Sequence, residues 1–119
     1  MSTSDFESRL KLLRDRYTAS LPHKRAALGE AWQAFAADPG DRALRRELSM
    51  QLHRLSGSAG AYGYEAVGIA AAEADGLVGE HGGIVAFDRA QRVRCGELVQ
   101  KVIRALERAE TDAQRAEPS

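Results

Sequence analysis

The stretch Gln51–Tyr64, QLHRLSGSAGAYGY, places one histidine inside a helical pattern and follows it with glycines at helical spacing. Apolar side chains recur at steps of three and four residues through this stretch and the residues before it. At about 100° per residue, that spacing puts them on one stripe of a long helix. The stripe consists of Leu44, Leu48, Leu52, Leu55, Ala59 and Tyr62. The pattern predicts an amphipathic helix from about Asp41 to Tyr62.

His53 falls on the opposite side of this helix, about 150° from the centre of the apolar stripe, so its side chain is predicted to face solvent. The same outer face carries Arg46, Ser49, Met50, Ser56, Gly57 and Gly60. Glycine inside a helix costs about 0.5–1 kcal/mol relative to alanine. Gly57 follows His53 by about one turn and Gly60 by about two, which leaves room for another surface to reach the ring. We interpret this face as a docking surface around a reactive imidazole.

The residues before Asp41 predict two helices. Apolar side chains recur at helical spacing at Phe6, Leu10, Leu13 and Tyr17, and further along at Leu28, Ala31, Trp32 and Phe35. Ser4 or Asp5 can cap the first helix, which we expect to end near Ser20. Pro22 suits the opening turn of the second helix. Asp38, Pro39 and Gly40 then break the pattern.

The second half of the chain predicts two more helices. Their stripes are Val67, Ala70, Ala71, Ala74, Leu77 and Val78, and then Cys95, Leu98, Val99, Val102, Leu106 and Ala109. Gly63 interrupts the chain before the first of these helices, and Gly79, Gly82 and Gly83 mark a loop after it. The last helix is expected from about Phe87 to Glu110, with residues 111–119 as a flexible tail.

These segments predict an all-α fold, an antiparallel up-and-down four-helix bundle with an additional N-terminal helix covering one end. The chain has 119 residues and 44% hydrophobic content, which suits one domain over residues 1–119 with an ordered core at about 4–110. Seventeen basic and seventeen acidic side chains balance to zero net charge, so nucleic acid and anionic membranes are not expected partners.

Cellular location is inferred from the cysteine content and the N-terminus. Cys95 is a single cysteine, which excludes an intrachain disulfide, and it lies on an apolar stripe as a small core residue. The N-terminal segment lacks an apolar signal core, and no apolar run approaches the roughly 18 residues of a membrane span. We expect a cytoplasmic protein and a monomer.

The run HRLSGSAGAYGY resembles the signature of the histidine-containing phosphotransfer (HPt) domain family. In that signature the histidine is followed by any residue, then an aliphatic residue, then a position that is usually lysine, then a glycine, small residues and a second glycine. The matching positions are His53, Leu55, Gly57, Ser58, Ala59 and Gly63. The resemblance implies a helical bundle in which His53 carries a phosphoryl group between aspartates of receiver domains, on response regulators or a hybrid sensor histidine kinase. It implies no cofactor in this chain, because the receiver domain contributes Mg²⁺.

Two further positions bear on His53. Ser56 stands where the family usually has lysine, and its hydroxyl can donate only a neutral hydrogen bond to a phosphoryl group. In the family, a polar residue 22 positions after the histidine commonly touches the ring, and that position here is Asp75. A carboxylate accepting the Nδ1 proton would leave Nε2 as the attacking nitrogen. The alternative is that Asp75 is an ordinary solvated charge. Arg46 and Arg54 are weak candidates to replace the lysine.

Three functional classes other than a phosphocarrier are an autonomous kinase, a noncatalytic adaptor and a metal-binding bundle. The sequence has no Gly-rich loop after a strand and no Walker-type GKS or GKT, which argues against an autonomous kinase. A noncatalytic helical adaptor that binds receiver or kinase domains would use the same docking face without transferring phosphate. A metal-binding bundle would need His23, His53 and His81 to converge from separate elements, and we favour ordinary surface positions for His23 and His81.

Overall fold

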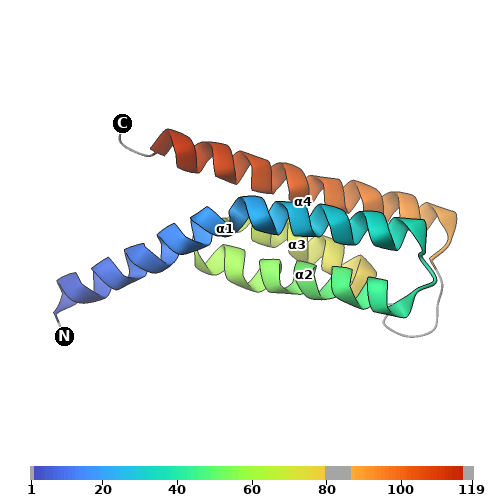
Figure 1. Ribbon diagram of the computed structural model, residues 1–119, viewed down its shortest axis with the longest axis horizontal. Coiled ribbons are helices and arrows are strands. Elements are labelled where there is room, and N and C mark those ends of the chain that lie inside the picture. The colour runs from blue at the N-terminus through green and yellow to red at the C-terminus, as the bar shows by residue number, and fades with distance from the viewer. Residues whose placement is uncertain (1, 80–86, 117–119) are drawn as a thin grey trace.

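The computed structural model describes residues 2–79 and 87–116. These residues form four helices and no strand: α1 (Thr3–Ala37), α2 (Arg42–Ala61), α3 (Glu65–Gly79) and α4 (Arg89–Ala116). The predicted all-α class is confirmed. The helices form a bundle in which α2 packs against α1 and α3, and α4 packs against the same two helices. Figure 1 shows that consecutive helices run in opposite directions.

The largest departure from the predicted fold is α1, which continues through Pro22 as a single helix. The prediction of two helices on either side of Pro22, the first of them an additional N-terminal element, is wrong. Proline removes one intrahelical hydrogen bond and crowds the preceding turn, which can kink a helix without ending it. Tyr17, Leu21 and Leu28 are buried along one face across the proline, so packing holds both halves in one helix. Figure 1 shows α1 bending between its dark-blue and light-blue parts.

Two helix ends also differ from the prediction. Ser2, rather than Ser4 or Asp5, caps α1, because its hydroxyl accepts the backbone N–H of Asp5 at 3.2 Å. The last helix begins at Arg89 instead of Phe87 and continues past Glu110 to Ala116. Residues 111–116, which the sequence assigned to a flexible tail, are therefore helical. Gly82, Gly83 and residues 117–119 lie outside the described residues.

The core is built from the predicted apolar stripes of α2, α3 and α4 together with the second half of α1. Its largest fully buried side chains include Phe35, Leu21, Leu28, Leu48, Leu52, Leu106, Val67, Val78, Val99 and Val102. The predicted stripe at the start of α1 is buried only at Tyr17, whereas Phe6, Leu10 and Leu13 are exposed. Figure 1 shows the reason, because the dark-blue part of α1 extends beyond the ends of its neighbours.

The connection between α2 and α3 sets how these two helices pair. Gly63 has φ +91°, a left-handed conformation that favours glycine. The Tyr64 N–H donates to the Ala59 carbonyl at 2.8 Å and the Gly63 N–H to the Gly60 carbonyl at 3.1 Å, which is the Schellman arrangement at a helix C-terminus. Gly68 then lets α3 lie against α2, because a Cβ there would come within 3.3 Å of the Gly60 nitrogen.

Candidate functional site

The exposed face of α2 presents His53 beside a carboxylate from α3. The His53 side chain is 79% exposed, as the helical register predicted. Its Nδ1 atom lies 3.3 Å from Oδ2 of Asp75, whose side chain is 21% exposed. The other ring nitrogen, Nε2, has no hydrogen-bond partner among the residues that the structure describes. The structure thus brings His53 together with Asp75, the residue to which the family resemblance pointed, and leaves one imidazole nitrogen without a hydrogen-bond partner in the described part of the chain.

Asp75 is itself held by a residue that the sequence did not single out as part of the site. The Ser49 hydroxyl donates to Oδ1 of Asp75 at 2.9 Å. Both carboxylate oxygens of Asp75 therefore have a partner on α2: Oδ1 accepts from Ser49, and Oδ2 lies beside Nδ1 of His53. Ser49 precedes His53 by four residues, which places the two side chains on one face of the helix. The sequence analysis placed Ser49 on the face of His53, but helical spacing alone gave no signal that it bonds to Asp75.

Gly79, at the end of α3, packs directly against this pair. A Cβ at Gly79 would lie 3.1 Å from Oδ1 of Asp75 and 3.4 Å from the Ser49 hydroxyl oxygen. The missing side chain therefore leaves space for the Ser49–Asp75 hydrogen bond. A shallow surface hollow surrounds the group, lined by Ser49, Met50, His53, Arg54, Asp75, Gly76 and Gly79.

The two glycines of the predicted docking face are open in the way the sequence suggested. Gly57 and Gly60 are exposed, and a Cβ at either would meet no atom within 4 Å. Packing within the described part of the chain therefore does not require glycine at these two positions. Gly68 differs, because it is buried against the α2 backbone.

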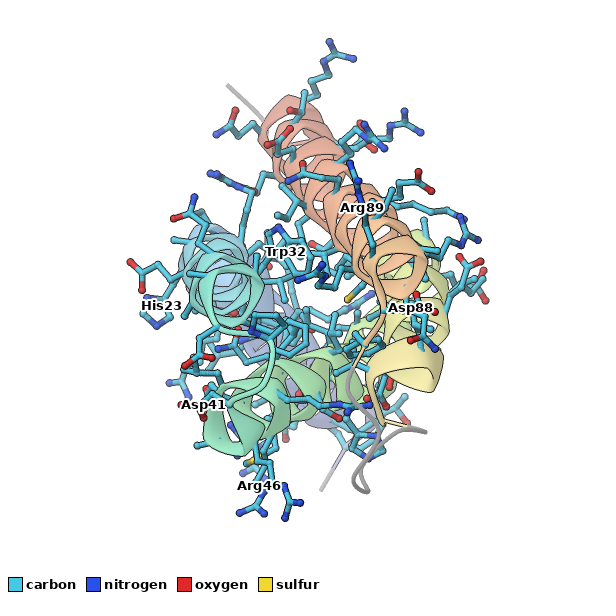
Figure 2. The ribbon with its side chains drawn as sticks, turned by 90° about the vertical axis from the view of Figure 1, so that its right-hand side faces the viewer. His23, Trp32, Asp41, Arg46, Asp88 and Arg89 are labelled. Carbon is cyan, nitrogen blue, oxygen red and sulfur yellow. The ribbon has the colours of Figure 1, made fainter. Side chains whose placement is uncertain are left out.

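The candidates for the missing lysine are unevenly placed. The Ser56 hydroxyl donates to the His53 backbone carbonyl at 2.7 Å, so its hydrogen is directed into the helix rather than toward the ring. Arg54 lines the hollow that contains His53. Arg46 is exposed, and Figure 2 shows it pointing away from the bundle. Of the two arginines, Arg54 is the one that lines this hollow.

The remaining candidates lie away from this face. His23 is exposed in the middle of α1, not at a helix start, and Figure 2 shows it directed outward. His81 lies outside the described residues, and among the residues that are described no cluster of three metal-ligating side chains occurs. Cys95 is fully buried, as predicted, and burial raises the pKa of its thiol to about 11. A thiol with that pKa is protonated, and so unreactive, near neutral pH.

Comparisons with protein-family models, curated proteins and solved structures gave no match. Across residues 2–79 and 87–116, no helix combines the length and the apolar character that crossing a membrane requires. The chemistry of the site must therefore be argued from its own geometry.

Proposed function

We propose that this chain is a histidine phosphotransfer protein of a two-component phosphorelay, which carries a phosphoryl group on His53 between aspartates of receiver domains. The observation that carries the proposal is the pairing of an exposed His53 with Asp75 through Nδ1, with Nε2 open. We also propose that its fold is the antiparallel up-and-down four-helix bundle of the HPt family, and that the protein is cytoplasmic and monomeric.

The geometry supports attack by Nε2. A neutral ring with its proton on Nδ1 donates to Oδ2 of Asp75 and keeps a lone pair on Nε2. That lone pair attacks the phosphorus of an aspartyl phosphate, so a P–N bond forms and the P–O bond to the aspartate breaks. The electron pair of the broken bond stays on the departing carboxylate. The Nδ1 proton remains in place, and the positive charge of the phosphorylated ring faces Asp75.

The partner supplies the remaining chemistry. In this proposal the receiver domain contributes Mg²⁺ and stabilises the charge of the transferring phosphoryl group, so the chain acts as a phosphocarrier without cofactor or kinase activity of its own. The open surface at Gly57 and Gly60 supports close approach of a second protein to His53. Because Arg54 lines the hollow around His53, it is the cation that we propose in place of the lysine that is usual in the family.

The proposal is tested by incubating the chain with a phosphorylated receiver domain. The wild type should acquire acid-labile, base-stable phosphate, and His53→Gln should acquire none. Because His53 is exposed, its replacement should change the free energy of unfolding by no more than about 0.5 kcal/mol. Equal thermal melts of the two proteins are the control for folding.

Two results would contradict the proposal. Phosphate uptake by His53→Gln would mean that another residue is the acceptor. Stable binding of phosphorylated receiver domains without any phosphate uptake by the wild type would instead support the noncatalytic adaptor. Receiver domains encoded in the same genome form the test set.

A further inference from the structure

We propose that Ser49 is a positioning residue for His53, acting through Asp75, and that Gly79 keeps the space in which it does so. The inference rests on the proposed function, since it concerns which ring nitrogen accepts the phosphoryl group. It goes beyond that function because it makes the lone pair on Nε2 depend on the Ser49 hydroxyl, which bonds to Asp75 and not to the ring.

The first step concerns the freedom of the Asp75 carboxylate. The terminal torsion of an aspartate is broad, so one contact to an exposed ring leaves the carboxylate free to rotate. The Nδ1–Oδ2 distance of 3.3 Å is at the long end for such a contact. The Ser49 hydroxyl bonds to Oδ1 at 2.9 Å from a half-buried position. That bond fixes one oxygen and directs the other toward His53.

Gly79 supports the same conclusion from a different helix. A Cβ at Gly79 would lie tight against Oδ1 of Asp75, the oxygen that Ser49 holds. The carboxylate is the end of a flexible side chain, so it would move to relieve the contact. Its present position thus depends on a hydroxyl from α2 and on an absent side chain at the end of α3.

The consequence is the choice of tautomer. The nitrogen that carries the proton in a neutral imidazole is set by the hydrogen bond that the ring makes. With Asp75 held in place, Nδ1 keeps the proton and Nε2 keeps its lone pair. If the carboxylate turns away, the proton distributes over both nitrogens, and molecules protonated on Nε2 cannot attack through that atom.

The test reads the tautomer directly, by ¹⁵N NMR of the His53 ring in the full chain, at a pH at which the ring nitrogen shifts show the neutral form. Ser49→Ala and Gly79→Ala should each raise the Nε2-protonated fraction, and Ser49→Thr should retain the wild-type ratio. Ser58→Ala is the matched control, because it removes a hydroxyl from the same helix about 180° away from Ser49. This control should leave the tautomer unchanged.

A second readout uses phosphoramidate as a small phosphoryl donor. Attack by Nε2 forms the P–N bond to His53 and breaks the donor's P–N bond, with ammonia leaving after it takes a proton. Ser49→Ala and Gly79→Ala should slow phosphorylation at Nε2 roughly 3- to 10-fold, the loss expected when an orienting group is released. ³¹P NMR identifies the nitrogen that is modified.

The outcomes separate this inference from the proposed function. An unchanged tautomer in Ser49→Ala or in Gly79→Ala overturns the positioning role, even if receiver domains phosphorylate His53. A tautomer that shifts in both variants supports the positioning role, even if no receiver domain transfers phosphate to the wild type and the proposed function fails. Gly79→Ala loses no hydrogen-bonding group, so it keeps the test valid if Ser49→Ala folds poorly.

Discussion

His53 and Gly57 stand one helical turn apart on the exposed face of α2, and different constraints act on them. His53 has Oδ2 of Asp75, from another helix, 3.3 Å from its Nδ1 atom. A Cβ added at Gly57 would meet no atom within 4 Å. Since glycine weakens a helix, and packing within the described chain does not require it here, the proposed approach of a partner is the reason that we assign to it.

Replacing Gly57 should therefore separate stability from function. Gly57→Ala should keep or raise the free energy of unfolding by up to about 1 kcal/mol, because alanine is the better helix former and its Cβ meets open space. Transfer from a receiver domain should become slower, and slower still in Gly57→Gln. Urea unfolding and transfer rates on the same samples test this. If a folded Gly57→Gln protein transfers at the wild-type rate, this glycine does not clear a path to His53.

At the scale of elements, the packing of α1 against α4 depends on Gly96. Unlike Gly57, this glycine has a neighbour that an added Cβ would strike. Figure 2 shows Trp32 directed from α1 toward α4. A Cβ at Gly96 would lie 2.9 Å from Cζ2 of Trp32, closer than real Cβ contacts allow. Gly96 thus lets the indole lie against the α4 backbone.

Gly96→Ala should destabilise the protein although alanine favours the helix. Overpacking against a large ring costs about 1–3 kcal/mol, which over most of that range is larger than the gain of up to about 1 kcal/mol from helix propensity. Gly29→Ala is the control, because Gly29 is inside α1 and an added Cβ there meets no atom within 4 Å. Thermal and urea unfolding of both variants should show opposite signs. A Gly96→Ala protein as stable as the wild type would mean that Trp32 repacks without cost.

The two halves of α1 should differ in what they contribute. Leu28 is fully buried, whereas Leu13 is 45% exposed on the part of the helix that extends beyond the bundle. Leu28→Ala should cost about 2–5 kcal/mol, the range for cavity-forming changes in a core. Leu13→Ala should cost less than about 0.5 kcal/mol. Equal losses in urea unfolding would show that the first part of α1 is packed in solution.

At the scale of the whole molecule, the Cys95 thiol is a titratable group that is fully buried in the core. Burial raises the pKa of Cys95 from its ordinary value of 9.0 to about 11, an effect that the nearby charge of Arg45 partly offsets. Below about pH 9 the thiol is protonated in both the folded and the unfolded chain. Above that pH the unfolded thiol ionises first, so unfolding becomes more favourable.

The free energy of unfolding should therefore fall between about pH 9 and about pH 11, with Cys95 accounting for about 2–3 kcal/mol of the loss. Cys95→Ala should show a shallower decline over the same range. The other groups that titrate there are common to both proteins, so the difference in slope isolates the thiol. Parallel declines in urea unfolding at several pH values would place Cys95 in contact with water.

The sequence by itself determined that α2, α3 and α4 are helices, which of their faces are buried, and that His53 is exposed. Periodicity was sufficient because each stripe on α2, α3 and α4 reports which side of its own helix avoids water. Spacing from His53 also pointed to Asp75, although the family resemblance, rather than the residues alone, supplied the interval.

Tertiary structure alone decided what depends on neighbours distant in the sequence. Pro22 is a plausible helix start until continuous burial of Tyr17, Leu21 and Leu28 holds one helix across it. Phe6, Leu10 and Leu13 carry the pattern of a buried face but are exposed. The N-terminal part of α1 extends beyond α2 and α3, and α4 diverges from it (Figure 1). The bond from Ser49 to Asp75 and the space left by Gly79 arise where α2 meets α3, since a helical repeat specifies the direction of a side chain but not what it meets.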